Sequence, residues 1–392
     1  MISMKQTMRW YGPNDVLSLK DLKQAGISGI VTALHEIPVG DIWTKEAITE
    51  RRNLIESFGM QWSVIESLPV HEDIKKRSGN YKEYIENYKK SLHNIGKCGI
   101  AVVAYNFMPV LDWVRTDHFH ENEAGASVLK YDPLKFIYFD LFLLKRKNAE
   151  RDYTKEQVRA AQELGNNLSA EEKEELFKSI LLGLPGSTEN FTPEIIKGLL
   201  DSYSHITDKK LRENLVHFLS EVTPIAERSK INLAIHPDDP PFSVLGLPRV
   251  VSNYKDLKFI FNQVKSEANG LCYCTGSLGA NPDNDLLKIY DEFEGRIHFL
   301  HLRNVQKKVT GVFMESDHLN GDVPMVAVVK RIVNTLQKRK ESIPMRPDHG
   351  YLHTLEAHKN YYVGYSFIGR LKGLAELRGL ELGLQESFNL KL

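Results

Sequence analysis

The sequence predicts an α/β protein of the (β/α)8 barrel class. Eight short runs rich in β-branched and aromatic residues recur along the 392 residues, and amphipathic helical stretches separate most of them. This alternation indicates parallel strands joined by right-handed crossovers. An open doubly wound sheet is the alternative, but no G-x-G-x-x-G motif follows the first strand, which argues against a dinucleotide-binding sheet.

The predicted strands carry mostly Val, Ile, Leu and Ala, as expected of strands buried on both faces. The clearest helical stretches are residues 44–59, 323–340 and 368–388, where apolar residues recur with helical spacing. In chain order the strands are TMRWYG near residue 8, GIVTAL near 31, WSVIES near 64, AVVAYNF near 104, INLAIHP near 233, LCYCTG near 273, IHFLHLR near 300 and IPMRPDH near 346.

An insertion is predicted between the fourth and fifth strands, where the spacing is much longer than elsewhere. Residues from about 118 to 206 contain an aromatic run around Phe136 and a charged stretch with a helical pattern at 154–184. We therefore expect one catalytic barrel domain over residues 1–392 with a helical insertion inside it. Because the insertion follows a strand's C-terminal end, it is expected to act as a lid or an oligomer contact; a helical elaboration packed on the rim is the alternative.

Composition narrows the class of protein. Hydrophobic residues make up 42% and charged residues 26%, which is typical of globular proteins with a substantial core. Lys plus Arg and Asp plus Glu both number 51, so no overall charge favours nucleic acid or an anionic membrane. No window resembles a signal peptide or a membrane span, and three cysteines do not make a secreted disulfide framework. The expectation is a cytoplasmic enzyme.

Polar side chains gather at the predicted C-terminal ends of the strands, which is where barrel enzymes keep their active sites. We expect several of them to contact a substrate. They are Arg9, Trp10, His35, Glu36, Glu66, Asn106, His236, Asp238, Asp239, Cys274, His301, Arg303, Asp348 and His349.

Four consecutive strands, the fifth to the eighth, each end in a residue that can bind a divalent metal: His236, Cys274, His301 and Asp348. A lone His or Cys is more often a packed core residue, but one ligand from each adjacent strand would converge on one point. Such a set suits zinc and can equally hold manganese or ferrous iron. Cys272 lies one layer deeper on the same face and is expected only to pack.

Three arginines, Arg9, Arg303 and Arg346, lie around this predicted metal site. A guanidinium pairs well with a carboxylate, so the arginines predict an anionic small substrate. The alternative is that each arginine is tied to a carboxylate of the barrel itself.

Several motifs together resemble the mannonate dehydratase family, from MRWYG nearly to the C-terminus. The resemblance implies a TIM barrel of the xylose isomerase-like type, Mn²⁺ or ferrous iron as cofactor, and dehydration of D-mannonate in hexuronate breakdown. The motifs are YNFMPVLDW from Tyr105, HPDDPP from His236, CTGS from Cys274, HLR from His301, HLNGD from His318, MRPDHG from Met345 and GRLKGLAELRG from Gly369.

The resemblance also implies residue roles. The metal ligands fall on the four strand-end residues already chosen, the acid and base groups on His349 and Tyr365, and the family suggests a dimer or larger assembly. This chain has Val363 before Gly364 where the family commonly has proline. Substrate contacts are expected from Arg9, Trp10, His35, Asn106, Arg303 and Arg346.

Three other functions compete with this interpretation. An aldose isomerase would hold its metals mainly with carboxylates, so a cysteine ligand argues against it. A nucleic-acid phosphodiesterase would need a basic surface, which the neutral charge balance does not favour. A sugar-acid binding protein would leave the metal ligands and the adjacent acid and base unexplained.

Overall fold

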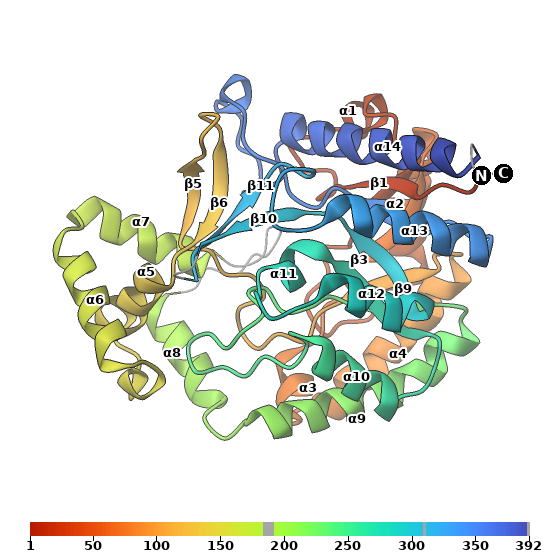
Figure 1. Cartoon of the computed structure of the whole chain (residues 1–392). Helices are drawn as coiled ribbons and strands as arrows, with labels where there is room; N and C mark the ends of the chain where they lie inside the picture. The colour runs from red at the N-terminus through yellow and green to blue at the C-terminus, as the bar shows by residue number, and fades with distance from the viewer. Residues whose placement is uncertain (183–191, 309–310, 390–392) are drawn as a thin grey trace.

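A closed barrel of eight parallel strands forms the centre of the protein (Figure 1). The computed structural model describes residues 1–182, 192–308 and 311–389. The strands follow one another around the barrel in the order β1-β12-β9-β8-β7-β4-β3-β2, and all eight predicted strands are confirmed. They are β1 (Lys5–Arg9), β2 (Gly29–Thr32), β3 (Gln61–Glu66), β4 (Val102–Tyr105), β7 (Asn232–Ile235), β8 (Asn269–Cys274), β9 (Ile297–His301) and β12 (Pro344–Arg346).

Helices surround the barrel. Several begin at a side chain that caps the first turn: Thr44 caps α2, Thr207 caps α9 and Asp285 caps α12. Among the described residues, no helix is both long enough and apolar enough to span a bilayer. The surrounding helices are α1 (Leu19–Gln24), α2 (Lys45–Ser57), α3 (Glu72–Lys76), α4 (Tyr81–Lys97), α9 (Asp208–Arg228), α10 (Tyr254–Gln263), α11 (Thr275–Gly279), α12 (Leu286–Phe293), α13 (Met325–Arg339) and α14 (Phe367–Asn389).

The barrel interior is filled by a small cluster separate from the large core between strands and helices. Its members are Val31, Val64, Val102, Ala104, Ala234, Cys272 and Phe299. Cys272 therefore packs in the interior, as predicted. Because these side chains fill the barrel interior, a substrate can bind only at the strand ends.

Strand register brings the predicted site residues to one level. Cys274 of β8 pairs with His301 of β9, and His301 pairs with Arg346 of β12. Because the strands are parallel, all three residues lie at the same C-terminal edge.

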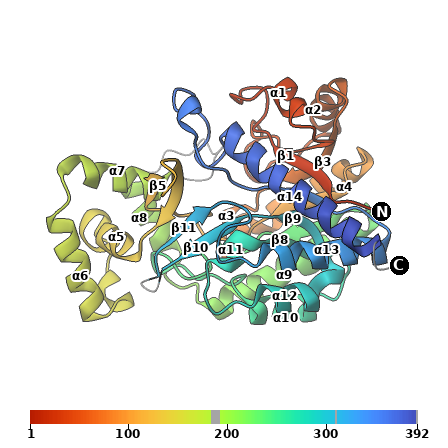
Figure 2. The same ribbon diagram turned by 45° about the horizontal axis from the view of Figure 1, so that its top comes forward.

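Between β4 and α9 the chain leaves the barrel. Its helical part stands to one side of the barrel in both ribbon views (Figures 1 and 2). It comprises α5 (Pro133–Tyr138), a π-helical segment η1 (Phe139–Leu144), a short 3-10 helix η2 (Ala149–Asp152), α6 (Lys155–Asn166), α7 (Ala170–Leu181) and α8 (Pro193–Ser202). Residues 183–191 of the predicted insertion lie outside the described residues.

The same region contributes to a second sheet that the sequence analysis did not anticipate. This antiparallel sheet has the order β10-β11-β6-β5 and joins the insertion to the segment after β9. Its strands are four or five residues long, and β5 reads DHFHE, so they lack the apolar runs that identified the barrel strands. They are β5 (Asp117–Glu121), β6 (Ser127–Tyr131), β10 (Asn304–Lys307) and β11 (Phe313–Ser316).

Gly350, just after β12, allows two backbone segments to approach closely. A Cβ atom there would overlap the backbone of Gly369 and Arg370 at the start of α14. We expect Gly350→Ala to lower the free energy of unfolding by about 1–3 kcal/mol, since the crowding atoms belong to backbone and cannot rotate away. Urea unfolding measures this change.

Gly379→Ala is the matched control, because among the described residues no heavy atom beyond the adjacent residues and the backbone of α14 lies within 4 Å of the position its Cβ would occupy. An alanine in an open helical position is expected to stabilise the protein by about 0.5–1 kcal/mol. Equal unfolding midpoints for the two variants would contradict the close approach at Gly350.

Candidate active site

Three of the four predicted metal ligands meet at the C-terminal end of the barrel. His236 follows β7, Cys274 ends β8 and His301 ends β9. One ligand-type atom from each lies within 4.8 Å of the other two. Cys274 and His301 are fully buried, whereas His236 is partly exposed. The described residues thus contain a His/Cys cluster that could hold a metal ion.

The chemistry of this cluster fits a divalent metal. Two imidazoles and a thiol are ligands that zinc, manganese and ferrous iron all accept in proteins. The buried Nδ1 atom of His301 has no hydrogen-bond partner among the described residues. An unpartnered buried nitrogen is costly unless something else binds it, which favours a metal at this position.

Asp348, the fourth predicted ligand, borders the cluster but is not part of the three-residue group. Its Oδ2 lies 3.7 Å from the Cys274 thiol, and its Oδ1 lies 3.6 Å from Nδ1 of His301. Burial alone would raise the pKa of Asp348, but Arg346, His349, His301 and Arg303 hold that pKa well below its usual value. Asp348 is therefore an ionised carboxylate beside the cluster.

Arg346 is bound to carboxylates of the barrel. Its Nη2 donates to Oε1 of Glu66 at 2.8 Å, and its Nη1 lies 2.6 Å from Oδ1 of Asp348. Its Nε approaches Nε2 of His301 at 3.0 Å. Burial raises the pKa of Glu66, yet Arg346, His301 and Arg9 more than offset burial and leave that pKa well below its usual value. Arg346 thus orients both a candidate ligand and its neighbouring carboxylates.

Arg303 is also tied to carboxylates of the protein, to Asp239 in the segment after β7 at 2.8 Å and to Glu315 of β11 at 3.1 Å. Gly276 makes room for it, because a Cβ there would overlap the Arg303 guanidinium. Asp239 is in turn held by two hydrogen bonds, of 2.7 and 3.1 Å, from the fully buried Arg115. The alternative in which the arginines bind the protein itself therefore applies to Arg303 and Arg346, and also to Arg9, whose Nη1 lies 3.6 Å from Oε2 of Glu66.

Arg9 and His35 have unused hydrogen-bonding atoms. Arg9 donates from Nη1 to the carbonyl oxygen of Glu66, while its buried Nε has no partner among the described residues. Nε2 of His35 is also buried and unpartnered there. Burial, together with Arg9 and Arg51, lowers the pKa of His35 to about 3, so this imidazole is neutral at physiological pH.

Trp10 and Asn106, by contrast, already have partners. The indole Nε1 of Trp10 donates to the carbonyl oxygen of Leu17 at 3.1 Å. The amide of Asn106 donates to Oδ2 of Asp112 at 3.0 Å. Their predicted substrate contacts remain predictions.

His349 and Tyr365, the predicted acid and base groups, lie side by side with ring centroids 5.0 Å apart. A bridge between Gly350 and Tyr365, with the Gly350 N–H donating to Gly364 O at 2.9 Å, holds the two segments together. Gly364 has a φ of +82°, so this turn forms with Val363 at the preceding position. Burial raises the pKa of Tyr365, and Asp348 and Glu66 raise it further against the opposing effect of Arg346 and Arg9. Tyr365 therefore carries its proton at neutral pH.

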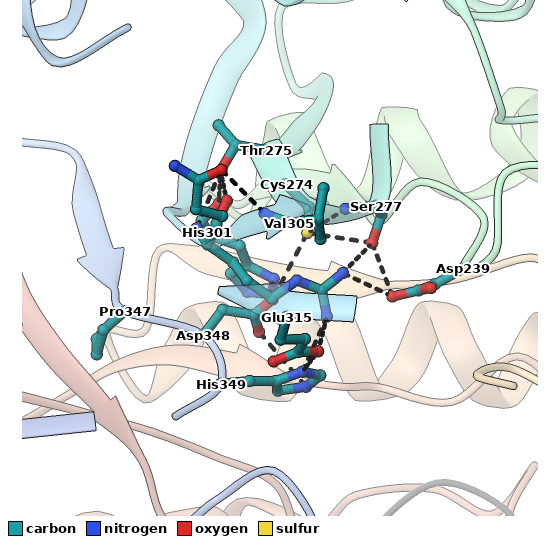
Figure 3. A network of polar contacts seen from close by, with 12 residues as sticks. Asp239, Cys274, Thr275, Ser277, His301, Val305, Glu315, Pro347, Asp348 and His349 are labelled. Atoms are coloured by element: carbon teal, nitrogen blue, oxygen red, sulfur yellow. Dashed lines mark hydrogen bonds and ion pairs between the residues drawn. The ribbon is translucent and has the colours of Figure 1, made fainter. Parts of the chain in front are cut away.

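Sequence reasoning missed three residues of this network: Arg115, Ser277 and Glu315. Figure 3 shows Ser277 between Cys274 and Asp239, and Glu315 against His349. The Ser277 hydroxyl lies 3.2 Å from the Cys274 sulfur and 3.0 Å from Oδ2 of Asp239. Ser277 was visible in the CTGS motif, whereas neither Arg115 nor Glu315 follows a barrel strand, so the strand-end rule could not find them.

Known proteins resemble this chain over nearly its whole length. A family model described as D-mannonate dehydratase (UxuA) matches residues 4–391. A mannonate dehydratase of Marinomonas sp. (strain MWYL1) is 50% identical over 390 residues, covering 98% of this chain and 100% of that protein. A mannonate dehydratase of Chromohalobacter salexigens is 46% identical over 388 residues, covering 98% and 99%.

Solved structures agree. The crystal structure of mannonate dehydratase from Streptococcus suis serotype 2 superposes with a TM-score of 0.79 at 32% identity, covering 99% of this chain and 95% of that one. A D-tagatose 3-epimerase-like protein, with a TM-score of 0.51, 10% identity and 99% of both chains covered, shares the fold alone. On the strength of the family model and of these relatives, the chain belongs to the D-mannonate dehydratase family.

Proposed function

We propose that this enzyme removes water from D-mannonate at the strand-end cluster, with a divalent metal bound, and releases 2-keto-3-deoxy-D-gluconate. One observation carries the proposal for the site. Three ligand-type side chains converge within 4.8 Å, Asp348 borders them, and the adjacent His349 packs against Tyr365. Ligands and proton carriers therefore share one end of the barrel, in an enzyme of the matching family.

His236, Cys274 and His301 would hold the metal, with Asp348 as the fourth ligand. We propose Mn²⁺, with ferrous iron as the other metal this donor set accepts. A bound ion would supply electrophilic stabilisation for the negative charge that develops as the proton next to the substrate's carboxylate leaves.

Two proton transfers fall to the protein itself. The C2 proton must be taken up, and the C3 hydroxyl must be protonated because hydroxide is a poor leaving group. We propose that His349 and Tyr365 share these roles. Imidazole is suited to exchanging protons at neutral pH, and the buried Tyr365 retains a proton that it can donate.

The substrate's carboxylate and hydroxyl groups need partners as well. Nε of Arg9 and Nε2 of His35 are buried and have no hydrogen-bond partner in the part of the chain that the structure describes, which makes these two residues the first candidates. Arg303 and Arg346 would bind substrate only by sharing groups that now bind Glu315, Asp239, Glu66 and Asp348. Trp10 and Asn106 complete the proposed binding set.

The decisive assay incubates the purified protein with Mn²⁺ and D-mannonate and measures 2-keto-3-deoxy-D-gluconate. We expect product with metal present and none after chelation, with Mn²⁺ restoring the activity. Other aldonates, run in parallel, measure the selectivity for D-mannonate. Absence of product from metal-loaded protein would contradict the proposed reaction.

Three further proposals concern the setting of the enzyme. We propose one catalytic domain over residues 1–392, an insertion at about 118–206 that covers the site or contacts a second copy, and a homo-oligomeric enzyme in the cytoplasm. Three free cysteines, all buried, suit a reducing compartment. Light scattering of the purified protein measures its molar mass and so tests whether it is an oligomer. The same measurement after substitution of the insertion's exposed residues tests whether the insertion forms the contact.

A further inference from the structure

Glu315 makes the closest polar contact to His349. The carboxylate lies on β11, is buried, and places Oε1 2.6 Å from Nδ1 of His349 (Figure 3). Neither a barrel strand end nor any predicted role accounts for it. A buried acid in contact with a proposed proton carrier needs a physical explanation.

The charges around Glu315 keep it ionised. Arg303 donates from Nη1 to Oε1 at 3.1 Å, and Nη2 of Arg115 lies 3.8 Å from the same oxygen. Burial raises the pKa of Glu315, but His349, Arg303 and Arg115 together bring it below its usual value. An ionised carboxylate can only accept hydrogen bonds.

The tautomer of His349 follows from this geometry. With Glu315 accepting, Nδ1 must carry the proton, and the Arg303 Nη1 atom 2.8 Å from Nδ1 then donates to Glu315 instead. In the neutral ring, Nε2 then keeps its lone pair. It lies 4.0 Å from Oδ1 of Asp348, on the side of the metal-type cluster, and has no hydrogen bond to any described residue.

The small antiparallel sheet fixes the position of Glu315. In the register of β10 and β11, Glu315 stands opposite Val305, two residues after Arg303. On the other side of β11, Phe313 pairs with Tyr131 of β6, so the insertion's hairpin extends the same sheet. Ser127 at the start of β6 also bridges to Leu352, close to His349 in the chain.

We propose that Glu315 is a positioning residue, which holds His349 in the Nδ1–H tautomer so that Nε2 faces the reacting substrate with a free lone pair. The inference rests on the proposed role of His349 in the dehydration. The small antiparallel sheet then has a role in the site, because its strand β11 places the Glu315 carboxylate against His349. Carboxylate partners fix histidine tautomers in this way in many enzymes.

The kinetic test uses Glu315→Gln, which keeps the shape of the side chain but lets its amide either donate to or accept from Nδ1. We expect kcat to fall by about 10- to 100-fold with KM changed by less than about threefold. In a His349→Asn background the same substitution should cost nothing further, because Glu315 acts through His349. The control is Glu381→Gln, since Glu381 is a buried acid of α14 that accepts from the Met4 N–H far from the site.

A second measurement does not depend on turnover. In protein loaded with Zn²⁺, a diamagnetic ion that this donor set accepts, and labelled with ¹⁵N-histidine, the His349 ring nitrogens, assigned by their absence in His349→Asn, should report Nδ1–H in the wild type. Glu315→Gln should shift them toward a mixture. Nε2–H in the wild type, or equal losses from Glu315→Gln with and without His349, would overturn the proposal. If the wild type makes no product, yet shows Nδ1–H that Glu315→Gln shifts toward a mixture, the proposed dehydration is wrong and only the control of the His349 tautomer by Glu315 stands.

Discussion

Replacing His349 by Asn is expected to lower kcat by about 10²- to 10⁴-fold, the range that one positioned acid or base contributes. An asparagine side chain can still donate an amide N–H to Glu315, so the local hydrogen bond survives. It cannot take up a proton at neutral pH. Steady-state kinetics with D-mannonate measures the loss, and metal analysis of the same sample shows whether the ion is retained.

The control for this variant is His298→Asn. His298 lies on the outer face of β9, with Nε2 bonded to the carbonyl oxygen of Glu267, so its substitution should leave kcat unchanged. His349→Asn protein that keeps its metal and turns over at the wild-type rate would remove His349 from the mechanism. Loss of metal from His349→Asn would instead mean that the loop around Asp348 had shifted.

The barrel and the convergence of its strand-end residues could be predicted from sequence because both follow short-range rules. A strand buried on both faces must be apolar along its length, and a parallel barrel sends all its strand ends to one edge. Cys274 and His301 therefore had to meet once their strands were recognised, and the register pairs them directly. His236 could be placed beside them in the same way, because it follows β7, the barrel strand next to β8.

Long-range pairing of charged residues could not be predicted in the same way. Arg115 and Asp239 are 124 positions apart, and nothing in either local sequence specifies the other as its partner. Glu315 lies on a strand whose four residues show no diagnostic periodicity, in a sheet assembled from segments far apart in the chain. The arginines were expected to bind the substrate's carboxylate, but Arg303 pairs with Asp239 and Arg346 pairs with Glu66. A buried guanidinium without a partner would lower the stability of the fold, so these ion pairs are expected in the unliganded protein.

Substituting Cys274 by Ala should cost the protein its metal. The cluster has three close ligand-type atoms, and removal of one leaves two imidazoles with Asp348 to one side. Changes outside the ligand shell already weaken metal binding by about 10- to 100-fold, so loss of a ligand should exceed about 100-fold. Mn²⁺ content after dialysis, measured by elemental analysis, should fall to that of chelated protein, and dehydration should fall with it.

Cys272→Ala separates ligation from packing. Cys272 precedes Cys274 by two residues on β8, so both side chains point into the barrel, and both sulfurs are fully buried. Each variant deletes one sulfur from the same strand, and the packing losses should be similar. Only Cys274, however, lies in the three-residue cluster, whereas Cys272 packs among Val31, Val64 and Phe299. Metal loss in Cys274→Ala alone would therefore arise from a broken metal–sulfur bond, while unchanged Mn²⁺ in Cys274→Ala would exclude the thiolate as a ligand.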